Sequence, residues 1–312
     1  MNATEGAHST WTVRRRFVPK ALLVGALVAA TALACRGKSR PSAAPEPDAP
    51  AVARRGRGPS RDVTFLAMSD THFGYVSESV HAALVGKLDG IAGHPYPPQL
   101  GGAVAAPRGL LIAGDLTEWG RQEELARFLA FYGNGDAGSS VKLPVYEVIG
   151  NHDKVAGHWV EEAVAARHGS RSYSFDWDDV HFVTLGEAPD DDALAWLARD
   201  LDRYEKNVPL VVLFHLALLG PWSTDNWFAE GMFKDRLAAA LAGRCVAAII
   251  HGHHHAWGHY TWHGIDVYKP GAVKDDTNVF AVFHLHAATK TVAFYDHVKD
   301  TWVSGEAKDL CP

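Results

Sequence analysis

The sequence predicts an α/β fold, and three observations lead to this prediction. Short apolar runs of strand length alternate with segments whose apolar residues recur at helical spacing. Five of the apolar runs are followed within two residues by Asp, Asn or His. The chain after residue 61 has about 250 residues, which suits one large domain, and we find no internal repeat.

The first half of this region alternates regularly. In chain order we expect strand 63–68, helix 77–91, a Gly- and Pro-rich loop 93–107, strand 109–113, helix 122–132, strand 145–149 and helix 160–167. The helix at 122–132 carries Leu125, Phe128, Leu129 and Tyr132 on one face.

The second half continues the pattern and adds a hairpin. We expect strands 172–177 and 181–185 joined by an Asp-rich turn, helix 191–204, strand 210–214, helix 232–241, strand 245–250, and closing strands 265–269, 279–286 and 291–295. Leu194, Leu197 and Leu201 mark the apolar face of the first of these helices.

The N-terminal 61 residues do not resemble the rest. Three arginines, Arg14–Arg16, precede an apolar run at 21–34 that is short for a membrane span, so residues 1–34 read as a signal peptide. The arginines followed by Phe17 resemble a twin-arginine export pattern. Cleavage after Ala34, lipidation of Cys35 in a lipoprotein box, and an uncleaved anchor all remain open. Residues 35–61 are rich in Pro, Ala, Arg and Ser and read as a flexible tether.

Charge argues against one class of partner. Residues 62–312 hold 19 of the 30 Lys and Arg and 33 of the 36 Asp and Glu, a net charge of −14 with neutral histidines. An acidic body disfavours contact with a phosphate backbone, so we do not expect nucleic acid as a partner. The oligomeric state is not readable.

The cysteines do not indicate a disulfide framework. Only Cys245 and Cys311 follow Cys35. Cys245 opens an apolar run, which is typical of a buried small hydrophobic residue, and no partner for Cys311 can be read.

The polar residues after the five strands predict a metal site. They are Asp70 and His72, Asp115, Asn151 and His152, His215, and the cluster His251–His255. In open α/β sheets, ligands gather outside the carboxyl ends of the strands. If the His cluster continues its strand, alternation would turn His253 and His255 to one side and His254 to the other. Taken singly, each Asp could instead cap a helix or a turn, and each His could be a core residue.

Together these blocks resemble the calcineurin-like metallophosphoesterase family. The matching motifs are Asp70-x-His72, Gly114-Asp115, Gly150-Asn151-His152-Asp153, His215 and Gly252-His253-x-His255, in family order. The resemblance implies a four-layer αββα sandwich of two mixed β-sheets, and a metal-dependent phosphoric ester hydrolase.

The resemblance also implies roles for single residues. Two divalent ions (Fe, Mn, Zn, Co or Ni) would be held, one by Asp70, His72 and His255 and the other by Asn151, His215 and His253, with Asp115 bridging both. A metal-bridging hydroxide would attack a phosphomonoester or phosphodiester. His152 would protonate the leaving group, oriented by a hydrogen bond to Asp153. His251 and His254 have no family role and are expected to support packing.

One departure from the family pattern and two loops bear on which kind of phosphoesterase this is. Purple acid phosphatases have a tyrosine ligand where this chain has Glu118, so we expect Glu118 to act in the loop or behind the ligands. Segments 220–228, rich in aromatics, and 93–107 are candidates for flanking the substrate. The alternatives are a cyclic-nucleotide-type phosphodiesterase, a non-catalytic envelope protein that binds metal, and a structural envelope protein; intact ligands argue against the last.

Overall fold

The structure of the chain is a computed structural model. It describes residues 61–133, 140–223, 231–275 and 277–311. The signal peptide and nearly all of the tether predicted from the sequence lie outside these residues. Within the described ranges, every helix is too short or too polar to cross a bilayer.

The first sheet combines three parallel strands with three antiparallel ones. Its order is β12-β11-β10-β1-β2-β3, in which β1, β2 and β3 are parallel. The strands are β1 (Asp62–Met68), β2 (Leu110–Ala113), β3 (Val145–Val148), β10 (Val279–His286), β11 (Thr289–Asp296) and β12 (Thr301–Asp309). β10 runs antiparallel to β1, with Phe65 opposite Phe283.

The second sheet is also mixed. Its order is β4-β5-β6-β7-β9-β8, and β5, β6, β7 and β9 are parallel while the two outermost strands are antiparallel. The strands are β4 (Tyr173–Trp177), β5 (Val180–Thr184), β6 (Leu210–Leu213), β7 (Val246–Ile250), β8 (Trp257–Trp262) and β9 (Ile265–Pro270).

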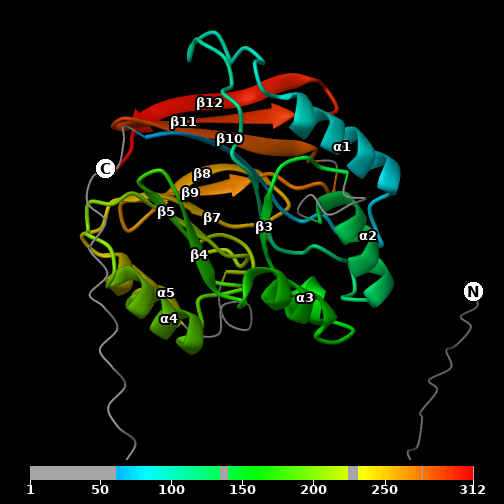
Figure 1. Cartoon of the computed structure of the whole chain (residues 1–312), viewed down its shortest axis with the longest axis horizontal. Coiled ribbons are helices and arrows are strands. Elements are labelled where there is room, and N and C mark those ends of the chain that lie inside the picture. Colours follow the sequence, from blue (N-terminus) through cyan, green and yellow to red (C-terminus); the bar gives the residue numbers. More distant parts are fainter. Residues whose placement is uncertain (1–60, 134–139, 224–230, 276, 312) are drawn as a thin grey trace, which may run out of the picture. The chain divides into compact units, whose positions relative to one another are not determined.

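Helices cover the outer face of each sheet (Figure 1). α1 (Glu78–Gly90), α2 (Gln122–Tyr132) and α3 (Trp159–His168) pack on the first sheet, and α4 (Asp191–Leu201) and α5 (Gly231–Leu241) pack on the second. The inner faces of the sheets share a core that includes Phe65, Phe182 and Phe283. The predicted αββα sandwich is therefore confirmed.

The apolar runs form strands because both of their faces are buried. In β1, Leu66 and Met68 face the helices, whereas Phe65 and Ala67 face the other sheet. A strand buried on both faces reads as a continuous apolar run, as residues 63–68 do. The two strands that the sequence did not predict, β8 and β12, each lie at one edge of a sheet. Edge strands are partly exposed and carry polar residues and glycine, so their pattern is weak.

Our interpretation of the cysteines was wrong. Cys245, just before β7, forms a disulfide with Cys311, just after β12. The bond links the second sheet to the last strand of the first sheet. Pairing depends on the approach of segments 66 residues apart, which spacing in the sequence does not reveal.

The insert at 93–107 packs on the edge of the first sheet. Trp302 Nε1 on β12 donates a hydrogen bond to the carbonyl oxygen of Pro95 (2.8 Å), and the Tyr96 and Trp302 rings lie 5.6 Å apart. These contacts place the insert against β12, which is separated from the metal-ligand strands by β11 and β10.

Candidate metal centre

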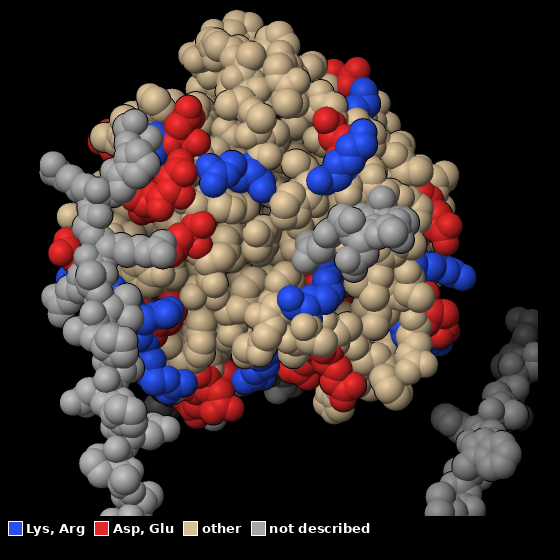
Figure 2. Space-filling view, in the orientation of Figure 1, with Lys and Arg blue, Asp and Glu red and all other residues tan. Residues whose placement is uncertain are grey.

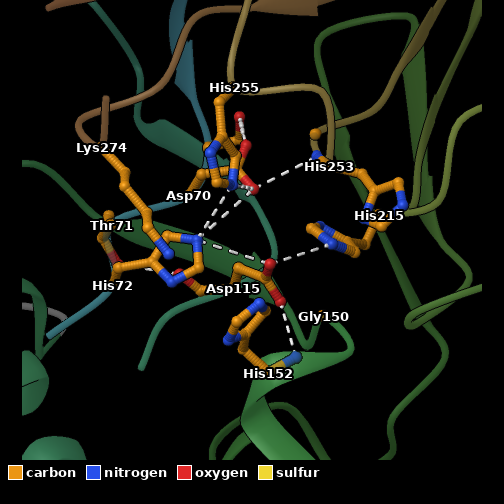
Figure 3. A network of polar contacts seen from close by, with 12 residues as sticks. Asp70, Thr71, His72, Asp115, Gly150, His152, His215, His253, His255 and Lys274 are labelled. Carbon is orange, nitrogen blue, oxygen red and sulfur yellow. Dashed lines mark hydrogen bonds and ion pairs between the residues drawn. The ribbon is translucent and has the colours of Figure 1, made fainter. Parts of the chain in front are cut away.

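The carboxyl ends of five strands meet at one edge of the sandwich. β1, β2 and β3 deliver Asp70, His72, Asp115, Asn151 and His152 from the first sheet, and β6 and β7 deliver His215, His253 and His255 from the second. Their side chains converge, as Figure 3 shows for the labelled residues. All seven predicted metal ligands thus lie in one region.

The backbone at five of these ligands is left-handed. The residues with positive φ are Asp70 (53°), His72 (43°), Asp115 (51°), His253 (72°) and His255 (46°). For a residue other than glycine, the left-handed backbone conformation costs roughly 1–2 kcal/mol in conformational free energy. Residues in this conformation cluster at functional sites. The segment after Ile250 is consequently a bent loop, so our expectation of strand alternation through His253 and His255 was wrong.

Two glycines allow the strand ends to approach each other. A Cβ on Gly150 would lie 2.1 Å from Asp115 Oδ1, and a Cβ on Gly114 would lie 2.5 Å from His215 Nδ1. Any larger residue at either position would push these ligands apart. The site therefore requires glycine at the positions before Asp115 and Asn151, because a side chain there would not fit.

The first cluster is formed by Asp70, His72, Asp115 and His255, whose ligand atoms all lie within 4.8 Å of one another. His72 Nε2 lies 3.2 Å from His255 Nε2 and 3.5 Å from Asp115 Oδ2. His255 Nε2 lies 3.5 Å from Asp70 Oδ1. Two imidazoles and two carboxylates that point at a common centre suit a transition-metal ion.

The second cluster contains Asp115, His215 and His253. His215 Nε2 lies 3.4 Å from Asp115 Oδ2 and 3.1 Å from Asn151 Oδ1. Asp115 Oδ1 accepts a hydrogen bond from the backbone N–H of His152 (2.9 Å), which fixes the carboxylate. Asp115 Oδ2 therefore faces His72 on one side and His215 on the other, and Asp115 belongs to both clusters.

Each of three candidate ligand imidazoles has an acceptor beside its second nitrogen. His215 Nδ1 donates to the carbonyl oxygen of Ala113 (2.7 Å), and His72 Nδ1 lies 2.7 Å from Glu118 Oε2. His255 Nδ1 lies 2.5 Å from Asp275 Oδ2. The hydrogen bonds to Ala113 and Asp275 fix the tautomers that present Nε2 of His215 and His255 to a metal. His72 Nδ1 lies close to the Glu118 carboxylate without the geometry of a hydrogen bond to it. The sequence suggested this supporting place for Glu118 but gave no signal for Asp275.

Burial and charge set the protonation of the imidazoles. Burial lowers the pKa of His72 to about 2 and the pKa of His253 to about 3, so both rings are neutral and able to bind a metal. Burial acts on His215 in the same direction, but the carboxylate of Asp115 outweighs it and raises the pKa of His215 to about 10. Burial raises the pKa of Asp70.

His152 lies at the site, but Asp153 does not orient it. The His152 and His72 rings are 4.7 Å apart, and His152 Nδ1 donates to the carbonyl oxygen of Glu118 (2.8 Å). The fully buried Asp153 instead accepts hydrogen bonds from the backbone N–H groups of Leu116, Thr117 and Gly150 and from the Thr117 hydroxyl. Asp153 ties the loops after β2 and β3 together, and our orienting role for it was wrong.

The other residues of the His cluster have structural partners. His251 is buried, with Nε2 2.7 Å from the Tyr260 hydroxyl, and His254 Nε2 donates to the carbonyl oxygen of Pro221 (2.6 Å). Trp222, from the predicted aromatic segment, has its ring 5.9 Å from that of His253, whereas residues 224–228 of that segment lie outside the described residues.

The donor set fits divalent transition metals. Imidazoles, carboxylates and an amide oxygen form two groups that share one carboxylate, as a two-metal site requires. Asp70, His72, Asp115 and His255 would hold one ion. Asp115, Asn151, His215 and His253 would hold the other.

Two solved structures share this fold. The structure resembles that of GAP50, the anchor in the inner membrane complex of Plasmodium, at 11% identity and a TM-score of 0.57, over 80% of this chain and 90% of that one. It also resembles a purple acid phosphatase from yellow lupin (Lupinus luteus), PPD1, at 12% identity and a TM-score of 0.54, over 82% of this chain and 55% of that one. A search of curated proteins gave no significant match.

A family model decides the assignment. The model of the calcineurin-like phosphoesterase matches residues 63–257, which is more than half of the chain and contains all seven candidate ligands. The matched region runs from β1 to the start of β8 and so includes the five strand ends that build the site. The chain therefore belongs to the calcineurin-like phosphoesterase family and is a phosphoric ester hydrolase of that family.

Proposed function

We propose that the chain is an exported phosphoesterase that uses two divalent metal ions to hydrolyse a phosphomonoester or a phosphodiester. The observation that carries this proposal is the position of Asp115, whose Oδ2 lies within 3.5 Å of an imidazole from each cluster. Bound there, two ions would supply a water of lowered pKa and positive charge for the phosphorus oxygens.

The protein's own contribution is to hold ligands and move a proton. Asp115 accepts a hydrogen bond from the backbone N–H of His152, and His215 and His255 are held by hydrogen bonds to Ala113 and Asp275. His152 Nδ1 carries a hydrogen, which it donates to the backbone carbonyl oxygen of Glu118. A second proton on this ring would therefore bind at Nε2. We propose that His152 Nε2 gives that proton to the leaving oxygen.

Two features support export. Arg14–Arg16 and the apolar run after them have the order of a signal peptide. The Cys245–Cys311 disulfide suits an oxidising compartment such as the periplasm, because reducing compartments keep thiols free. We further propose that Cys35 carries a lipid, so that the domain is held at the bacterial envelope by residues 36–61.

The surface favours a small phosphoester over a nucleic acid. On the face in Figure 2, basic side chains of the described residues alternate with acidic ones and form no broad basic area. A nucleic-acid partner would need such an area to neutralise its phosphates.

Reconstitution tests the proposal. The metal-depleted protein is loaded with Mn²⁺ or Fe²⁺ and assayed on p-nitrophenyl phosphate and on bis-p-nitrophenyl phosphate. We expect metal-dependent hydrolysis of at least one ester, and the preferred ester distinguishes a phosphatase from a phosphodiesterase of the cyclic-nucleotide type. Two bound ions without hydrolysis of either ester would support the non-catalytic metal-binding protein instead.

A further inference from the structure

Most of the exposed hydrophobic residues lie in the chain segments next to the predicted site residues. Among the described residues, eight large hydrophobic side chains are more than about a third exposed. Seven of the eight lie within seven residues of a predicted site residue, and they include Tyr75, Trp119, Trp222 and Trp257. Hydrophobic residues scattered singly over a surface need no explanation, but a concentration at one place marks an interaction site.

On one side, the aromatic residues stand beside His72 and His152. The backbone N–H of Tyr75 donates to the carbonyl oxygen of His72 (3.0 Å), and the Tyr75 side chain is 64% exposed. The carbonyl oxygen of Trp119 accepts a hydrogen bond from Ala156 (2.8 Å), in the loop that follows His152. Trp119 is 44% exposed.

On the other side, they stand beside His253 and His255. The Trp222 ring, 55% exposed, lies 5.9 Å from the His253 ring. Trp257 lines a cavity of about 380 Å³ together with His255, Val279 and Val303. We call Tyr75, Trp119, Trp222 and Trp257 the aromatic rim, because each lies beside a different residue of the candidate site.

Basic groups accompany the rim. Lys274 Nζ lies 4.7 Å from the centre of the Tyr75 ring, and the Arg121 guanidinium lies 6.0 Å from that of Trp119. Lys299 lines the same cavity as Trp257, together with Asp275 and Asp296. Each of these cations is paired with a carboxylate, Lys274 with Glu118, Arg121 with Glu124 and Lys299 with Asp296. The aromatic side chains therefore carry the argument for a lipid surface, because Trp and Tyr favour the boundary between lipid chains and head groups.

We propose that the aromatic rim contacts a lipid surface and seats the apolar part of an amphiphilic phosphoester, whose phosphate reaches the metal centre. This inference rests on the proposed hydrolytic function and names its substrate class. A water-soluble nucleotide has one flat base to stack, whereas the rim presents aromatic surface beside four separate site residues. The proposed lipid at Cys35 would keep the domain close to such a surface.

A series of esters with lengthening alkyl chains tests the substrate class. We would compare methyl and octyl p-nitrophenyl phosphate, and methyl and octyl phosphate, with the full chain. We expect kcat/KM to rise about 100-fold from methyl to octyl in the ester type that is hydrolysed, if seven methylenes each lose roughly half of their contact with water. Equal kcat/KM for the two chain lengths would overturn the inference, whereas absence of hydrolysis of every ester would overturn the proposed function itself.

Rim variants test whether these residues cause the preference. In Tyr75→Ser/Trp119→Ser/Trp257→Ser we expect the octyl-to-methyl ratio to fall below about 10. Trp222 is left intact because it contacts His253. The matched control is Trp196→Ser, which removes a partly buried Trp from α4 on the outer face of the second sheet and should keep the ratio. An unchanged ratio in the folded triple variant would contradict the proposal.

A third comparison separates a lipid surface from a dissolved amphiphile. The octyl ester is supplied either as a monomer or within vesicles of phosphatidylcholine and phosphatidylglycerol. We expect vesicles to increase turnover by the wild type, and the triple variant to lose most of that increase. If the enzyme prefers the octyl monomer but vesicles do not increase its turnover, the rim binds the alkyl chain of a dissolved substrate. That result would contradict contact of the rim with a lipid surface.

Discussion

The carboxylate of Glu118 lies 2.7 Å from Nδ1 of His72, behind the ring whose Nε2 faces the candidate metal centre. Lys274 Nζ lies 2.9 Å from the same carboxylate oxygen. Glu118 therefore lies between Lys274 and the imidazole of the candidate ligand His72.

Replacing Glu118 by Gln should weaken metal binding without unfolding the protein. An amide holds the His72 imidazole less firmly than a carboxylate and makes it less basic, so we expect a loss of affinity of about 10- to 100-fold for one of two ions. Competition with a chromogenic chelator measures this affinity. Glu123→Gln, an exposed change on α2, is the control, and equal affinities for the two variants would remove Glu118 from the site.

His152→Ala should separate metal binding from turnover. His152 is absent from both groups that hold the ions in our account, so the metal content should stay close to that of the wild type. Turnover of esters with poor leaving groups should fall by about 10²–10⁴, because those esters need a proton donor. Steady-state rates on alkyl and nitrophenyl esters give the comparison, and full activity on alkyl esters would exclude the proton-transfer role.

Binding of the second ion should release a proton. Asp115 raises the pKa of His215 to about 10 although burial opposes this, so the metal-free ring is protonated at neutral pH. A metal must displace this proton, and its apparent affinity should therefore fall about tenfold for each unit of pH below 10. Titration calorimetry in two buffers of different ionisation enthalpy counts the protons; binding independent of pH would show that His215 is neutral without metal.

The disulfide should contribute to stability but not to the chemistry. It closes a loop between residues 66 positions apart, which corresponds to about 4 kcal/mol in the free energy of unfolding. Cys245→Ser/Cys311→Ser should show this loss in denaturant titrations while its kcat at 25 °C is retained. Equal unfolding midpoints for the oxidised wild type and this variant would argue against the bond.

Much of the fold was readable because buried strands and their ends leave strong patterns. β6 and β7 are apolar throughout and β1 is mostly apolar, and each is followed within a few residues by a candidate ligand. The edge strands β8 and β12 were missed because exposure weakens the apolar pattern.

The fine structure of the site was less predictable. The left-handed backbone at Asp115 and His253 depends on the packing of both sheets, and no residue type announces it. Asp153 follows His152 in the sequence, yet a 3-10 turn over residues 152–154 directs its carboxylate to the loop after β2. Asp275 approaches His255 from a segment that no motif connects with the metal centre.

The most direct test of the shared carboxylate is the number of ions bound per chain in Asp115→Asn, beside His253→Ala and His255→Ala. Asp115 belongs to both clusters, whereas each histidine belongs to one. Elemental analysis after equilibration with Mn²⁺ or Zn²⁺ should give two ions in the wild type, one in each histidine variant and fewer than one in Asp115→Asn, with hydrolysis lost. Two ions retained in Asp115→Asn, or a single ion in the wild type, would contradict a dinuclear centre bridged by Asp115.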